Sequence, residues 1–222
     1  MEAFFAAIKQ GDRAEVERLL ASDPGLASAR DADGASAVLT AAYHRKREIL
    51  AILVATGPEL DVFEAATVGD LDRVRALVEA DRSLAAAVNT DGFFPLGLAA
   101  FFHHPDVVRY LVTAGADPRA AAKNPMNVTA LHSAVADGGD RESALALIAA
   151  GADVNARQRH GWTALHGAAD SGDRAIVEAL LAAGADPALA NRDGKTAADV
   201  ARERGHAELV ALLESAGSGV RP

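Results

Sequence analysis

The sequence contains no cysteine. This absence excludes disulfide bridges, zinc sites held by thiolates and cysteine nucleophiles. Aromatic residues are also scarce, at 5%, although half of the chain is hydrophobic and much of that half is alanine. β-Sheets are rich in β-branched and aromatic residues, whereas small side chains let helices pack closely in thin layers. We therefore expect an all-α protein.

Long apolar runs and an excess of positive charge are missing as well. The longest weakly polar run, from Phe93 to Phe102, is about half as long as a bilayer requires. The formal net charge is −9, which disfavours general binding to nucleic acid or anionic membranes. No basic segment followed by an apolar stretch opens the chain, so no secretory signal is expected. These features predict a cytoplasmic protein, and the 18 arginines against 4 lysines suggest a bacterial origin.

Two short phrases recur along the chain at nearly constant spacing. Gly-Ala-Asp begins at residues 115, 151 and 184, and Thr-Ala-Leu-His or a related start stands at 129, 163 and 196, so that the spacing lies between 33 and 36 residues. Each interval contains two apolar stripes at helical spacing, separated by glycine. Neither helix of such a pair can bury its stripe alone, so neighbouring pairs must stack.

These phrases, with Asp-Gly before the first helix of a pair, resemble ankyrin repeats. The resemblance covers nearly the whole chain and is strongest over residues 91–217. It implies an ankyrin-repeat solenoid of about seven stacked helix pairs joined by short hairpin fingers. Aligned alanines in the first helices step by 33 to 35 residues, except for a step of 24 between Ala41 and Ala65. One finger is therefore expected to be missing near 56–61.

We expect residues 1–217 to form a single ankyrin-repeat domain. Within it, residues 1–29 would be an N-terminal cap pair and residues 188–217 a C-terminal cap repeat, followed by a loose tail over 218–222. Phe4 and Phe5 are expected to seal the cap at the amino end. About two extra residues near Ala122 and Lys123 predict one finger that is longer than the others.

The seven histidines are the first candidates for chemistry. His132 and His166 each follow a threonine by three residues, where the resembled family uses histidine to bridge loop backbone groups of neighbouring repeats. His103 and His104 could contribute to a metal site, but adjacent histidines on one turn rarely face one ion, and no second pair of ligands is evident. His104 also matches a position that often carries histidine in ankyrin repeats. The structural role is favoured for His132, His166 and His104.

Motifs of the common enzyme classes are absent. The sequence has no glycine-rich phosphate loop, no serine elbow and no zinc-protease motif. Asp33 is explained by the turn that it forms with Gly34, and Asp140 by the helix that it caps. We predict no enzymatic activity, no cofactor and no metal.

The resembled family holds its partners on a concave face, made of finger tips and two late positions of each first helix. Half of the ten aromatic residues align with these positions. Exposed aromatic residues supply much of the energy of protein interfaces, although some of these could instead pack between repeats. The candidate partner-binding residues are Tyr43, His44, Phe93, Phe101, Phe102, Arg159, His160, Trp162 and Lys195.

The sequence thus predicts a non-catalytic, monomeric scaffold that binds another protein, with Arg45, Arg157 and Arg159 attracting an acidic partner. Two alternatives stay open. The gap of the missing finger, near residues 57–63, could hold a small ligand or an enzyme site, or the protein could be a self-associating structural component. Because one fold serves unrelated roles, the resemblance does not name the partner.

Overall fold

The computed structural model describes residues 1–218, which form seven helix pairs and no strand. The α-helices are α1 (Glu2–Gln10), α2 (Arg13–Ser22), α3 (Ala37–Tyr43), α4 (Arg47–Ala55), α5 (Val62–Val68), α6 (Leu71–Ala80), α7 (Pro95–Phe101), α8 (Pro105–Thr113), α9 (Ala130–Ala134), α10 (Arg141–Ala149), α11 (Ala164–Ser171), α12 (Arg174–Ala182), α13 (Ala197–Arg204) and α14 (Ala207–Gly217). The ankyrin-repeat solenoid of seven pairs is confirmed.

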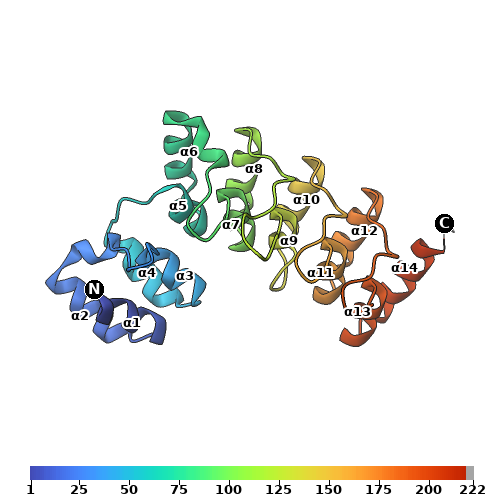
Figure 1. Ribbon diagram of the computed structural model, residues 1–222, viewed down its shortest axis with the longest axis horizontal. Helices are drawn as coiled ribbons and strands as arrows, with labels where there is room; N and C mark the ends of the chain where they lie inside the picture. Colours follow the sequence, from blue (N-terminus) through green and yellow to red (C-terminus); the bar gives the residue numbers. More distant parts are fainter. Residues whose placement is uncertain (219–222) are drawn as a thin grey trace.

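The pairs stack side by side into an arch. From α5 to α13 the first helix of each pair follows the inner side of the arch, and the second helices from α6 to α12 follow the outer side (Figure 1). The amino terminus lies at one end and α14 at the other (Figure 1). No helix of the described chain combines the length and the apolar character that a bilayer crossing needs.

Local sequence signals set the ends of the helices. In the sixth pair, Asp173 accepts a hydrogen bond from the N–H of Ile176 and so caps α12, while Gly172 ends α11 with a φ of 77°. A left-handed φ is cheapest for glycine, which explains the residue at that position. Asp140 caps α10 in the same way by accepting from the N–H of Glu142.

One apolar core runs through the whole stack. Leu165 on α11 and Ile176 and Leu180 on α12 are fully buried, and each such side chain contributes about 1.5–3 kcal/mol to folding. Phe4 and Phe5 are 1% and 3% exposed and close the core at the amino end. Of the expected tail, residues 219–222 lie outside the described residues, and Ser218 caps α14.

Five hairpin fingers precede the first helices, and each is named here after the pair that it precedes. They are the second (31–35), fourth (89–93), fifth (122–128), sixth (158–162) and seventh (191–195) fingers, each closed by a backbone N–H···O bond between its end residues. The fifth finger has the two extra residues that were predicted. The repeat pattern did not predict two short 3-10 helices, η1 (Pro24–Ser28) and η2 (Arg82–Ala86), which precede the second and fourth fingers.

The third pair has no finger, as the shortened spacing predicted. α4 ends at Ala55 and α5 begins at Val62, and the connection between them contains no hairpin. The second and fourth fingers therefore become neighbours: a Cβ atom on Gly34 would lie 4.0 Å from the Thr90 side chain. The α1–α4 block is tilted against the rest of the array at this point (Figure 1).

Gly97 on α7 and Gly167 on α11 provide a matched test of this packing. A Cβ atom on Gly97 would meet nothing within 4 Å, whereas one on Gly167 would lie 2.6 Å from Cγ2 of Val135. We expect Gly97→Ala to raise the free energy of unfolding by about 0.5 kcal/mol or more, because alanine restricts the unfolded chain and favours helix. Gly167→Ala should lower it, as measured by urea denaturation.

A Gly167→Ala/Val135→Ala double variant removes the clash. Its loss of stability should therefore be smaller than the sum of the two single losses, since residues in contact do not act independently. Additive losses would show that Val135 does not limit the space at Gly167.

Candidate functional site

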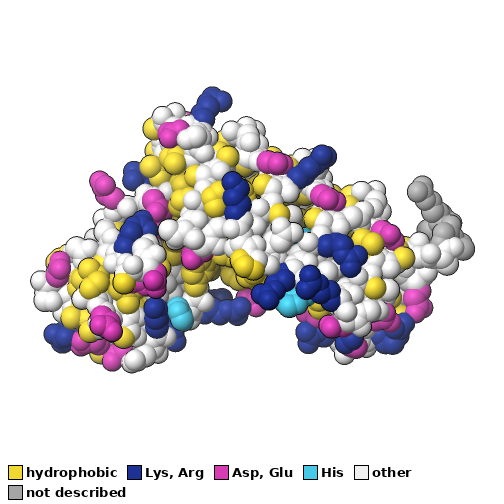
Figure 2. Space-filling view, viewed as in Figure 1, with side chains coloured by type: hydrophobic (Ala, Val, Ile, Leu, Met, Phe, Trp, Pro, Cys, Tyr) yellow, Lys and Arg dark blue, Asp and Glu magenta, His cyan; other side chains and the backbone are white. Residues whose placement is uncertain are grey.

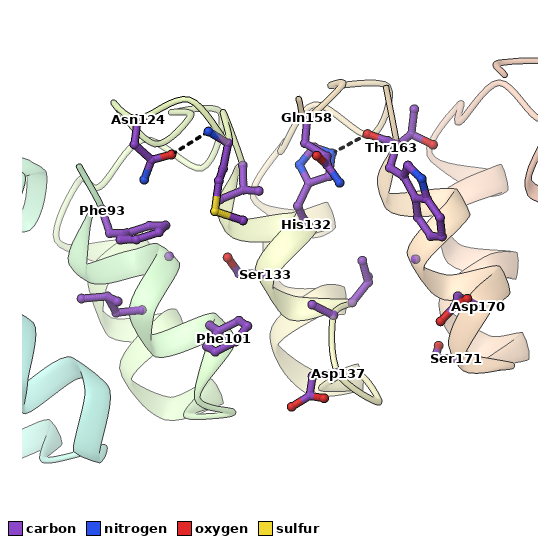
Figure 3. A pocket seen from close by; sticks show the side chains of 18 of the residues that line it. Phe93, Phe101, Asn124, His132, Ser133, Asp137, Gln158, Thr163, Asp170 and Ser171 are labelled. Carbon is purple, nitrogen blue, oxygen red and sulfur yellow. Dashed lines mark hydrogen bonds between the residues drawn. The ribbon is translucent and has the colours of Figure 1, made fainter. Parts of the chain in front are cut away.

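A groove of about 930 Å³ follows the inner side of the array, along the first helices α7, α9 and α11. The fingers form one wall, and the carboxyl ends of these helices form the other (Figure 3). The floor includes small residues from each of the three first helices, namely Gly97 on α7, Ser133 on α9 and Gly167 on α11. Small floor residues leave room for another chain to approach the helices closely.

Four of the five predicted aromatic residues line this groove. They are Tyr43, Phe93, Phe101 and Trp162, which come from the second, fourth and sixth helix pairs and their fingers. Tyr43 is 38% exposed and the other three are half-buried. Each of the four thus contacts the protein on one side and leaves part of its ring open to a ligand.

Phe102 is the fifth aromatic residue and joins the end of the groove to a second hollow. Its ring stacks on Tyr43 with the centroids 6.1 Å apart and meets Phe101 edge to face at 5.1 Å. The second hollow, of about 860 Å³, lies between α4 and the turns that follow α5 and α7. Residues 57–63 line neither of these two hollows.

The polar candidates lie outside the groove. His44, Arg159 and His160 are exposed and do not line it. Lys195 belongs to a smaller hollow beside Trp162, where its Nζ lies 2.7 Å from a carboxylate oxygen of Glu203. Four of the predicted aromatic residues therefore line the groove, whereas the predicted histidines, Arg159 and Lys195 lie outside it.

The fifth finger contributes groove residues that sequence reasoning missed. Met126 at its tip is 51% exposed, and Asn124 and Pro125 line the groove with it. The Asn124 side chain accepts a hydrogen bond from the N–H of Met126 and fixes the tip (Figure 3). The two extra residues near Ala122 were the available signal, since they lengthen this finger.

The fingers are joined tip to tip by backbone hydrogen bonds. The N–H of Lys123 donates to Gly92 O at 2.7 Å, and that of Arg159 donates to Met126 O at 2.9 Å. Arg192 N–H continues the series to His160 O at 2.9 Å. These contacts hold the finger wall of the groove in register before any ligand arrives.

Two histidines fasten the fingers to the first helices, as predicted. His132 Nε2 donates to Trp162 O at 3.0 Å, and His166 Nε2 donates to Lys195 O at 3.0 Å. Nδ1 of each ring accepts from the N–H of the capping Thr129 or Thr163, which fixes the tautomer. Burial lowers the pKa of both imidazoles, although the carbonyl contacts oppose the shift.

His104 has a comparable role between neighbouring turns. Its Nε2 donates to Thr67 O at 2.9 Å, and burial lowers its pKa. The His104 ring therefore links the fourth pair to the backbone of the third pair. Within residues 1–218, no group of three or more His, Asp or Glu side chains is placed to hold a metal ion.

The ionisable residues in the groove lining, besides the histidine described above, are aspartates and one tyrosine. Asp137 pairs with Arg45 at 2.8 Å and Asp170 pairs with Arg204 at 2.6 Å. Burial raises the pKa of Tyr43 to about 12, and the negative charge of Asp91 adds to the increase. An apolar groove with a few polar groups can bind a chain segment and fix its orientation.

Comparison with known families identifies the repeat. A family model described as ankyrin repeats, in three copies, matches residues 62–158 and again residues 131–221. Together the two matches cover more than half of the 222-residue chain. The seven helix pairs and their fingers agree with this match.

A similar protein is Alpha-latrocrustotoxin-Lt1a of Latrodectus tredecimguttatus. It is 34% identical over 113 residues, which cover 47% of this chain and 8% of the toxin. The chain thus spans less than a tenth of that relative's length, and the likeness concerns one portion of it.

The buried histidines predict a pH-dependent stability. Their folded pKa lies below the unfolded value of about 6.5, so the unfolded chain binds more protons between the two values. This contribution to stability is fully present well above pH 6.5, and it should be lost as the pH falls through about 6.5 towards the lower folded pKa. We expect the melting temperature to decrease in this window.

A His166→Gln variant should start from a lower melting temperature and lose less of it on acidification. His44→Gln, at an exposed position, should retain the wild-type dependence. Equal pH profiles for His166→Gln and the wild type would show that this imidazole does not carry the effect.

Proposed function

This chain belongs to the ankyrin-repeat family, and we propose that it binds a segment of a partner protein in the groove along α7, α9 and α11. Ankyrin repeats are generally protein–protein interaction modules and are typically non-catalytic. We propose the same for this chain, with residues 1–217 acting as one monomeric domain. The groove is the feature that makes the proposal specific.

The aromatic lining of the groove is the observation that carries the proposal. Tyr43, Phe93, Phe101 and Trp162 leave ring surface open although the chain has only ten aromatic residues. Large apolar side chains in a preformed groove are the usual source of hot-spot energy. The finger contacts and histidine bridges supply the rigidity, which reduces the entropy lost on binding.

The length of the groove limits the size of the bound segment. Neighbouring helices pack about 10 Å apart, so the three pairs span about 20 Å from axis to axis. An extended chain rises by about 3.3 Å per residue, so roughly six residues would fill this length. A short peptide is therefore a suitable probe.

The proposal predicts that wild-type protein selects peptides with Trp, Phe or Leu from a displayed random-peptide library. Met126→Ala and Phe101→Ala should each weaken binding of the selected peptides by about 2 kcal/mol, roughly 30-fold, in fluorescence anisotropy. Met126 is exposed on a finger tip, so its substitution should leave the melting temperature unchanged.

Leu145→Ala provides the matched control. This leucine is 40% exposed on α10, an outer helix, and its loss should not affect peptide binding. Peptides that bind Met126→Ala and Phe101→Ala as tightly as the wild type would exclude the groove as the binding site.

A further inference from the structure

We propose that the partner segment carries a carboxylate next to its apolar anchor, and that arginines on the sixth and seventh fingers bind this carboxylate. The inference rests on the proposed function, since it assigns the chemistry of the segment that the groove holds. It starts from a group of three arginines and one histidine at one end of the finger wall. These are Arg157, Arg159, His160 and Arg192.

The backbone holds these residues together. Arg192 N–H donates to His160 O at 2.9 Å, which joins the tips of the two fingers. The guanidinium of Arg157 donates to the carbonyl of Ala190 and lies against Gly161, so it bridges the same fingers. Lys or Arg side chains gather beside a histidine at the middle of the inner edge of the arch (Figure 2).

The guanidinium groups of this cluster have no carboxylate partner among the described residues. Most other arginines do: Arg45, Arg141 and Arg204, for example, each lie within 3.0 Å of an aspartate oxygen. Arg159 and Arg192 form no ion pair in the described chain, although the protein has a net charge of −9. Two free guanidinium groups on adjacent tips match the planar, two-oxygen shape of a carboxylate.

Nearby acidic residues do not cancel this charge. Asp193 lies on the seventh finger and is exposed to solvent. Its single negative charge is smaller than the summed charge of the three guanidinium groups. Glu203 is engaged by Lys195 at 2.7 Å. The cluster therefore remains a local positive area on an acidic protein.

The cluster adjoins the groove. Gln158 and Trp162, at the two ends of the sixth finger, line the groove, and Arg159 and His160 lie between them in the chain. A segment with its apolar side chain against Trp162 would bring its next residues to these tips. At the far end of the groove, Asp91 on the fourth finger forms no ion pair in the described chain, so the opposite charges also favour one direction of the bound segment.

The test uses the peptides selected on wild-type protein, together with copies in which each Asp or Glu is replaced by its amide. We expect Asp or Glu within a few residues of the aromatic or leucine anchor. Arg159→Gln/Arg192→Gln should weaken the acidic peptides about tenfold. The amide copies should bind about tenfold more weakly to wild type and be insensitive to the double variant.

Arg82→Gln is the matched control, because Arg82 is also exposed and without an ion pair in the described chain but lies on η2 and does not line the groove. It should bind as the wild type does. Peptides that need Met126 and Phe101 but have no acidic preference, or ignore the arginine substitutions, would overturn the carboxylate site and leave the groove function standing. Failure to select any groove-dependent peptide would remove both.

Discussion

The stability of every helix pair depends on burial of its apolar stripe against the next pair. Leu165, Ile176 and Leu180 are fully buried in the one apolar core that joins neighbouring pairs. A stack of this kind has no closed centre, and its inner side stays accessible along its whole length. The arrangement therefore provides an extended surface for a chain segment in place of a deep cleft.

The polar contacts between repeats give that surface a defined shape. His132 and His166 tie two fingers to the first helices, and backbone bonds tie the finger tips to one another. α7 carries Gly97 at the position equivalent to these histidines, so that the fifth finger has no imidazole bridge from the fourth pair. Gly97 lines the groove together with Phe93 and Met126.

The missing finger shapes the other end of the groove. Without it, side chains of the second pair contact the fourth and fifth pairs directly. Tyr43 stacks on Phe102 of the fourth pair, and Arg45 forms an ion pair with Asp137, which follows α9. The arginine that the sequence suggested as an attractor for a partner is thus engaged within the chain. Arg159 forms no ion pair with a carboxylate among the described residues, so its guanidinium group is available for the role proposed above.

The sequence alone determined the helix pairs, their number and the absent finger, because each follows from residues a few positions apart or from a repeat period. The histidine bridges were expected from the resemblance to ankyrin repeats. Only the tertiary structure decided which aromatic residues meet, since Tyr43 and Trp162 approach one groove through the stacking of intervening repeats. It also decided that Met126 belongs to the groove and that Arg45 is paired. Such contacts depend on the small rotation at each repeat and on the bend at the missing finger, which no local pattern encodes.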